Sequence, residues 1–168
     1  MDADSFAALN AADRDRIRNK VTEALKEAGY DTESMRYDES YLLETEEGQL
    51  RIPIEVVVCL DQQPAILVKC VRGNLSTRER ASIALARLLG EQPIPFAIVA
   101  NETDAVVFDA MAGKAVGHGY QAFPRPTAAE KRLRECADFL IPPAQRAREK
   151  RILLTYYHLR CTVDMEAY

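Results

Sequence analysis

The stretch from Ile52 to Ala100, IPIEVVVCLDQQPAILVKCVRGNLSTRERASIALARLLGEQPIPFAIVA, decides the fold. It opens with two apolar runs, Ile52 to Leu60 and Ala65 to Val71, which are separated by the polar segment Asp61 to Pro64. Val and Ile favour extended strands, whereas Asp and Pro favour turns. Two strands joined by so short a loop pair most simply with each other, so we expect an antiparallel hairpin here.

A helix and a third strand follow this hairpin. Ser76 and Glu79 have the spacing of a capping box, in which both side chains satisfy backbone N–H groups at a helix start. Gly90 is placed to end that helix in the left-handed conformation, which predicts a helix from Thr77 to Leu89. Phe96 to Ala100 is another apolar run, and a strand, helix, strand connection normally makes its two strands parallel neighbours. The centre of the protein is therefore predicted to be a mixed sheet covered by a helix.

The segments on either side extend this sheet. An amphipathic helix begins near Asn10 or Asp13, because apolar residues recur at helical spacing as far as a stop at Gly29. Further strands are predicted at Met35 to Leu43, from Leu50 onward, at Ala105 to Phe108, and at the glycine-broken edge Ala115 to Tyr120. The sheet should have about six strands.

The character of the chain changes after residue 124. Thr127 and Glu130 form a second capping box, which predicts a helix to about Leu140. A last helix begins at Pro142 and Pro143 and runs to about Leu159, and its expected inward positions are Ala147, Ile152, Leu153 and Tyr156. We therefore divide the chain into an α/β core, residues 1–124, and a helical extension, residues 125–168. The extension packs on or beside the core, or else mediates association, so a homodimer is possible.

Composition points to a globular protein of the cytoplasm. Of the 168 residues, 48% are hydrophobic and 29% are charged. No apolar run approaches the roughly 18 to 20 residues of a membrane span, and the first residues lack the pattern of a secretory signal. The four cysteines show neither Cys-x-x-Cys pairing nor zinc spacing, which indicates reduced thiols. We therefore expect a cytoplasmic location without membrane association.

Charge is unevenly distributed along the chain. Residues 1–124 carry a net charge of −7, whereas residues 125–151 carry +4, within a total of −4. A basic helical face can contact phosphate, but an acidic protein has weak sequence-independent attraction for nucleic acid. We favour a solvated helix surface over a phosphate contact for this segment.

The order of elements resembles a known family. The first helix ends in Glu27-Ala28-Gly29-Tyr30, and it is followed by Arg51 to Val58, a turn, Ile66 to Gly73, a helix, and Ile98-Val99-Ala100-Asn101. Over roughly residues 14–124 this pattern resembles the N-terminal nuclease-like domain of type I restriction enzyme R subunits, a branch of the PD-(D/E)xK superfamily. The resemblance implies an α/β fold with a restriction-endonuclease-like mixed β-sheet flanked by helices, to which this chain adds its helical C-terminal extension.

The resemblance also implies where a nuclease site would lie. In active members an acid on the second strand, and an acid and a lysine two apart on the third, hold a divalent cation and activate water. Glu55 stands at the place of the first acid, but the later motif reads Lys69-Cys70-Val71. A lysine thus replaces a metal-binding carboxylate and an aliphatic residue replaces the lysine. The glutamine and tyrosine, four apart, that related nucleases often carry on the next helix are also missing from Ala81 to Leu89.

Two interpretations of Glu55 and Lys69 follow. Either the Lys69 ammonium lies beside Glu55 and takes the place of the cation, or the two are solvent-facing neighbours on paired strands, worth only about 0.2 to 1 kcal/mol. On the first interpretation the protein is a degenerate nuclease-like domain without a cofactor, which serves as a binding or interaction module for a protein or DNA partner.

The alternative function is a DNA nuclease with a rearranged centre that depends on Mg²⁺ or Mn²⁺, in which Glu55 is a metal ligand. Glu79 could supply a second carboxylate there, although its capping position already explains it. Arg72, Arg78 and Arg80 follow the third strand and are the candidate nucleic-acid-binding residues.

Overall fold

The computed structural model describes residues 11–46 and 48–165, and the side chains of residues 158–165 are outside this description. Its helices are α1 (Ala11–Ala28), η2 (Thr32–Ser34), η3 (Leu75–Arg78), α2 (Glu79–Leu88), η4 (Tyr120–Ala122), α3 (Pro126–Cys136) and α4 (Pro143–Met165). Its strands are β1 (Met35–Thr45), β2 (Gly48–Leu60), β3 (Gln63–Cys70), β4 (Phe96–Ala100), β5 (Ala105–Asp109) and β6 (Lys114–His118). None of the helices in the described part of the chain combines the length and the apolar character that a membrane span requires.

The six strands form one mixed sheet in the order β1-β2-β3-β4-β5-β6. All neighbours are antiparallel except β3 and β4, which are joined through α2 and run parallel, with Lys69 opposite Val99. The predicted α/β class, the crossover and the strand count are thereby confirmed. Strand β6, which is largely exposed, lies at the edge as expected.

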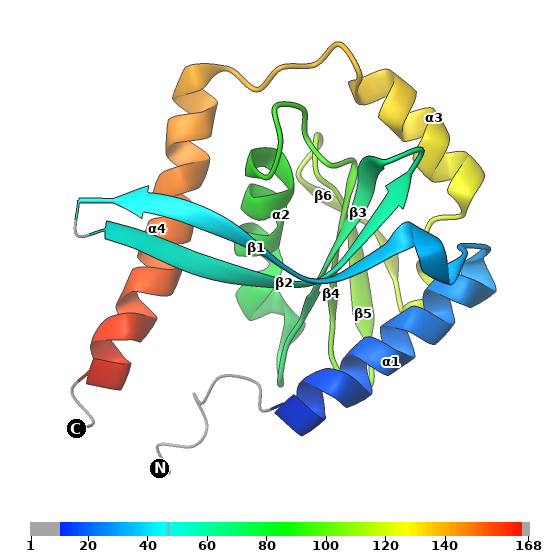
Figure 1. Ribbon diagram of the computed structural model, residues 1–168, viewed down its shortest axis with the longest axis horizontal. Coiled ribbons are helices and arrows are strands. Elements are labelled where there is room, and N and C mark those ends of the chain that lie inside the picture. Colours follow the sequence, from blue (N-terminus) through cyan, green and yellow to red (C-terminus); the bar gives the residue numbers. More distant parts are fainter. Residues whose placement is uncertain (1–10, 47, 166–168) are drawn as a thin grey trace.

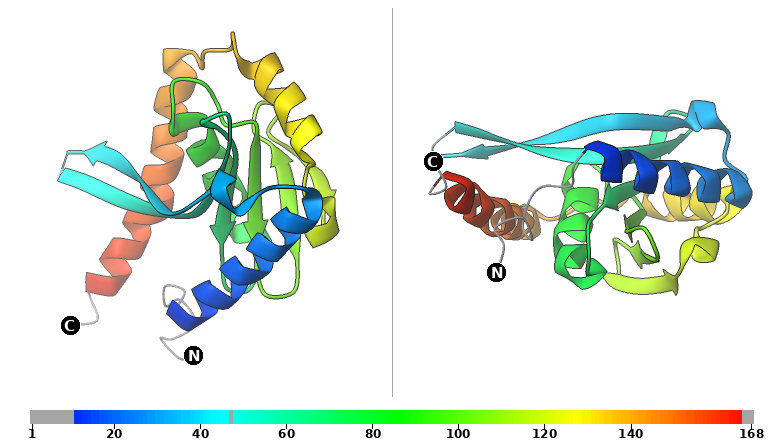
Figure 2. Two further views of the ribbon diagram at one scale, coloured as in Figure 1. Left: turned by 45° about the vertical axis from the view of Figure 1, so that its right-hand side comes forward. Right: turned by 90° about the horizontal axis from the view of Figure 1, so that it is seen from below.

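Helices cover both faces of the sheet (Figure 1). α1 buries Ile17, Val21 and Leu25 in an apolar cluster that also holds Ala129 of α3. α2 and α4 lie side by side over the other face, where Leu153 of α4 joins the second cluster. The outer part of the β1–β2 hairpin extends past the other strands and lies over α4 (Figures 1 and 2).

The ends of α2 differ from the prediction. Asn74, and not Ser76, caps this segment, because the Asn74 side-chain oxygen accepts hydrogen bonds from both the backbone N–H and the hydroxyl of Ser76. The chain then makes the 3₁₀ turn η3 before α2 begins at Glu79. The capping box of Ser76 and Glu79 is therefore wrong. Gly90 is not left-handed either, since the guanidinium of Arg146 donates to the carbonyls of Leu88 and Gly90 and satisfies that helix end instead.

The C-terminal helices also depart from the prediction. α3 begins with Pro126 in its first turn and has no side-chain cap, so the capping box of Thr127 and Glu130 is wrong. It ends at Cys136, before Leu140. α4 starts at Pro143, as expected, and extends to Met165. At the N-terminal side, α1 starts at Ala11, and the predicted start at Asn10 lies outside the described residues.

One expected inward position of α4 is wrong. Ala147 is exposed, whereas Glu149 is fully buried and Leu153 is buried as expected. Ile152 and Tyr156 are partly buried against the same cluster. The division of the chain at residue 124 remains a prediction, although α4 clearly packs on α2.

We predict that Leu153→Ala lowers the free energy of unfolding by about 2 to 5 kcal/mol, because the side chain is completely buried and its truncation leaves a cavity between α4 and α2. Leu140→Ala is the matched control: this leucine is 67% exposed, so its loss should change stability by less than about 0.5 kcal/mol. Urea unfolding of both variants measures the difference. Equal effects would contradict the packing of α4 on the core.

A second prediction concerns alkaline pH. The Tyr30 hydroxyl donates to the carbonyl of Pro124 at 2.7 Å, and burial, aided by the charge of Glu130, raises the pKa of Tyr30 above its ordinary value. A group whose pKa is raised by folding stabilises the protein fully below its unfolded pKa, near 10, and loses that contribution as pH rises further. The stability difference between wild type and Tyr30→Phe should therefore shrink above pH 10 in urea titrations. A difference independent of pH would contradict it.

Candidate functional site

The candidate site lies where β2 and β3 separate. Their regular pairing ends at Val56 opposite Val68. Beyond that pair, the Glu55 carboxylate, and not a backbone carbonyl, accepts the hydrogen bond of the Cys70 N–H at 2.9 Å. On the other side of β2, Asp38 of β1 has a φ of +55° and falls outside the regular β1–β2 pairing. Glu55 thus lies where the β2–β3 pairing has ended and beside the break in the β1–β2 ladder, and its carboxylate bridges to the backbone of β3.

Lys69 fills the rest of this gap. Its ammonium nitrogen lies 3.2 Å from each carboxylate oxygen of Glu55 and also donates to the carbonyl of Pro53. Glu55 is 4% exposed and Lys69 is 5% exposed. The solvent-facing alternative for this pair is therefore wrong, and the two side chains do form the ion pair. Because both charges are buried, the added hydrogen bonds to backbone groups are what make the pair tolerable.

Burial governs the protonation chemistry of this site. It lowers the pKa of the Lys69 ammonium, and the neighbouring Glu55 carboxylate opposes that shift. At Cys70, burial and then the charge of Glu55 raise the pKa of the thiol far above its ordinary value. The thiol next to the ion pair is consequently protonated at neutral pH and is a poor nucleophile.

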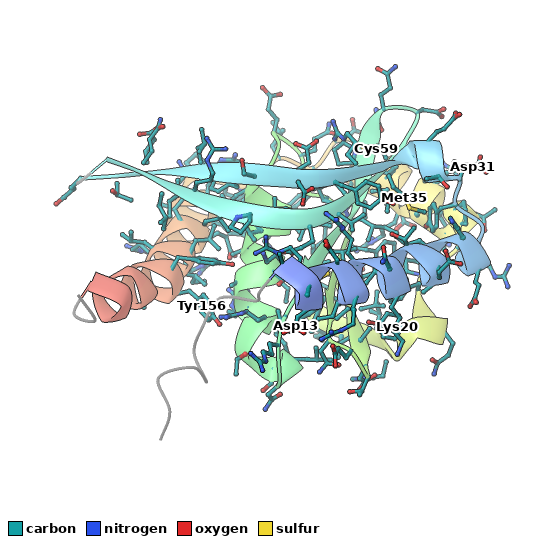
Figure 3. The ribbon with its side chains drawn as sticks, turned by 60° about the horizontal axis from the view of Figure 1, so that its bottom comes forward. Asp13, Lys20, Asp31, Met35, Cys59 and Tyr156 are labelled. Atoms are coloured by element: carbon teal, nitrogen blue, oxygen red, sulfur yellow. The ribbon has the colours of Figure 1, made fainter. Side chains whose placement is uncertain are left out.

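The side chain of Val71 takes no part in the polar contacts around Glu55 and Lys69. It is buried, it belongs to the apolar cluster beneath α2, and its backbone N–H donates to the carbonyl of Ala100 at 2.9 Å. The side chain that replaces the nuclease lysine is thus part of the core. It also borders a cavity of about 310 Å³ near the ends of β3 and β4, which Arg72 and Asp13 line as well. Figure 3 shows Asp13 on α1.

The three arginines proposed for nucleic acid do not converge on Glu55. Arg72 is exposed at the cavity just described. The Arg78 guanidinium carbon lies 4.7 Å from the ring centre of Tyr156, a residue on the side of α4 that faces the body of the domain (Figure 3). Arg80 lies 3.7 Å from Glu149 of α4. The structure therefore directs Arg78 and Arg80 toward α4.

The structure contains a second buried ion pair that the sequence did not predict. The Arg87 guanidinium lies 2.6 Å from Glu149, and it also donates to the carbonyls of Ala110 and Met111. Glu149 is completely buried, although it stands among basic residues that looked like solvated surface. One residue in the sequence could have indicated this pair. Arg87 lies within the apolar run of α2, and a charge on a buried helix face needs a partner of opposite charge.

Comparison with known proteins identifies the family. Residues 14–124 match the type I restriction enzyme R protein N terminus. The chain belongs to this family. No curated protein and no solved structure matches it. The match contains Glu55, Lys69 and Val71, whereas α3 and α4 lie beyond it.

The restriction-enzyme family resemblance implies a divalent cation, and the residues present do not fit one. Mg²⁺ requires several oxygen ligands at close range. Both Glu55 oxygens already contact the Lys69 ammonium, and one also accepts the Cys70 N–H. Among the side chains that the structure describes, no group of three His, Cys, Asp or Glu residues is placed to hold a metal ion together.

We predict strong coupling between Glu55 and Lys69. Lys69→Met should cost about 3 to 5 kcal/mol in urea unfolding, because it leaves the Glu55 charge buried without its counter-ion. Glu55→Gln combined with Lys69→Met should cost less than the sum of the two single changes by about 0.5 to 3 kcal/mol. Lys114→Met on the exposed edge strand is the control and should have little effect. Strict additivity in this cycle would contradict the ion pair.

Proposed function

We propose that this member of the restriction-enzyme R-protein family is a catalytically degenerate nuclease-like domain that serves as a binding or interaction module. The observation that supports this proposal is the position of Lys69. Its ammonium contacts both oxygens of Glu55, the one carboxylate retained at the places that the nuclease motif would occupy. The family match supports the shared fold, and the altered residues support the loss of chemistry.

An ammonium group can replace the charge of a metal ion but not its chemistry. It neutralises Glu55 and donates hydrogen bonds to that carboxylate and to the carbonyl of Pro53, so the buried carboxylate keeps a counter-charge. It has no open coordination position, so it cannot polarise a phosphate as a Lewis acid or lower the pKa of a bound water. Because Val71 is apolar and buried, no second lysine stands where the superfamily would use one.

A binding role requires only that the scaffold present its surface. Arg72 and Arg80 are exposed and are the candidates for contact with a nucleic acid, and a protein partner is the other kind of partner that the proposal includes. A cytoplasmic location and a homodimer remain predictions of the sequence.

We predict that calorimetric titration with Mn²⁺ or Mg²⁺ gives no saturable heat for the natural protein. A variant that restores the motif, Lys69→Glu with Val71→Lys, should bind the ion, because it removes the internal cation and adds a second carboxylate beside Glu55. Circular dichroism and urea unfolding establish that this variant folds, since position 71 is buried. Lys69→Glu alone, which leaves Val71 in the core, provides a second route to the same carboxylate pair.

Saturable binding by the natural protein would overturn the proposal if Glu55→Ala abolished it. That result would favour the alternative, a divalent-metal-dependent DNA nuclease with a rearranged centre. Cleavage of plasmid DNA in Mn²⁺ by the natural protein, absent from Glu55→Ala, would establish that activity directly.

A further inference from the structure

We propose that the exposed side of α4, which the sequence favoured as solvated surface alone, is a contact surface for the phosphate backbone of duplex nucleic acid. This inference rests on the proposal that the domain is a binding module, and it assigns that module a surface and a partner. The surface consists of Arg148, Lys150 and Arg151, which are all exposed; we call it the α4 basic face.

The α4 basic face is distinguished by the lack of compensating acid. Between residues 143 and 157 the sole acidic residue is Glu149, and it is buried against Arg87. Within the part of the chain that the structure describes, Arg148, Lys150 and Arg151 have no ion pair. These three charges therefore face solvent in an otherwise acidic protein.

The other long surface helix is neutralised differently. On α1, Arg16 pairs with Glu102, Arg18 with Asp38, and Lys26 with Glu23. The cations of α1 are thus compensated by contacts within the protein, so the positive charge of α4 is not a general property of the surface.

Arg80 connects this face with the family-matched core. Its guanidinium, which is 52% exposed as a side chain, lies 3.7 Å from Glu149 and therefore beside α4. Arg80, a residue that the sequence had marked for phosphate contact, thus approaches α4 from the family-matched core, although α4 itself lies outside the family match.

Two features favour a duplex backbone over a protein partner or a single strand. The large hydrophobic side chains exposed in the described chain are Leu42, Val116, Phe139 and Leu140, and none belongs to α4. A protein interface normally needs apolar or aromatic anchors, and a single strand needs aromatic platforms for its bases. Arg148 and Arg151, three residues apart, are instead neighbours on the outer side of α4, and Lys150 flanks them. Such a group of exposed cations suits the dense negative charge of a duplex backbone.

The test is fluorescence anisotropy with a labelled 30-base-pair DNA of mixed sequence, in EDTA, as a function of NaCl. The triple variant Arg148→Gln, Lys150→Gln, Arg151→Gln should weaken binding at low salt by on the order of tenfold or more. It should also reduce the slope of log affinity against log salt by about two to three, because each lost phosphate contact removes about 0.9.

The matched control removes the same number of positive charges from a different helix. Arg125→Gln, Lys131→Gln and Arg134→Gln remove three exposed cations from the segment of α3, where Glu130, Glu135 and Asp138 are also exposed. This triple variant should retain most of the affinity and the slope. Equal loss in both triples would show that only net charge matters and would overturn the proposal, as would undetectable binding by the natural protein.

Two further arms separate the alternatives. In a competition assay, unlabelled polyglutamate is added to the complex with labelled DNA. If polyglutamate displaces the DNA as efficiently as unlabelled DNA does, and if its binding is lost in the α4 triple variant, the partner is an acidic protein and the assignment to nucleic acid is overturned. Adding Mg²⁺ to the DNA complex distinguishes this inference from the proposed function: cleavage would contradict catalytic degeneracy while leaving the binding surface intact.

Discussion

The buried contact between Glu55 and Lys69 is the constraint on which the centre of this domain depends. β2 is no longer paired with β3 beyond Val56, the outer part of the β1–β2 hairpin extends over α4, and the Cys70 N–H at the end of β3 has no strand partner from β2. The Glu55 carboxylate satisfies that N–H, but a carboxylate can be buried only with a compensating charge. In a metal-dependent nuclease a divalent cation supplies the charge, and here Lys69 supplies it. An internal ammonium can therefore stabilise this fold where a metal-dependent nuclease uses a cation.

The same rule explains how α4 is attached. Glu149 lies inside the domain because Arg87 of α2 forms an ion pair with it. The other two guanidinium nitrogens of Arg87 donate hydrogen bonds to the backbone carbonyls of Ala110 and Met111. Arg146 joins α4 to α2 a second time by capping the carbonyl end of that helix. These directional polar contacts fix the position of α4 along α2, while Leu153 supplies the apolar burial. The helix is thus positioned specifically, although it lies outside the family-matched residues.

The sequence predicted the sheet well because strand signals are local. The apolar runs and the crossover between β3 and β4 could be inferred from residue pattern and family register. The contact of Glu55 with Lys69 was one of two interpretations that the sequence left open, and the burial of both side chains decides for it. The errors came from competition between chemically similar groups. Asn74 and Ser76 can each cap a helix, and only the three-dimensional path of the chain decides between them. Glu149 was missed because its partner Arg87 is 62 residues away in sequence, beyond the reach of any periodic pattern.

Binding and catalysis place different demands on such a scaffold. Hydrolysis requires carboxylates to remain uncompensated until a metal ion arrives, which costs stability in the metal-free protein. A domain that only binds has no such requirement, and on the proposed function Lys69 at the place of a metal ligand relieves the repulsion. Charges used for binding must instead stay uncompensated at the surface, where water solvates them at little cost. Compensated charges in the interior and uncompensated cations on α4 are the distribution that the proposed binding role predicts.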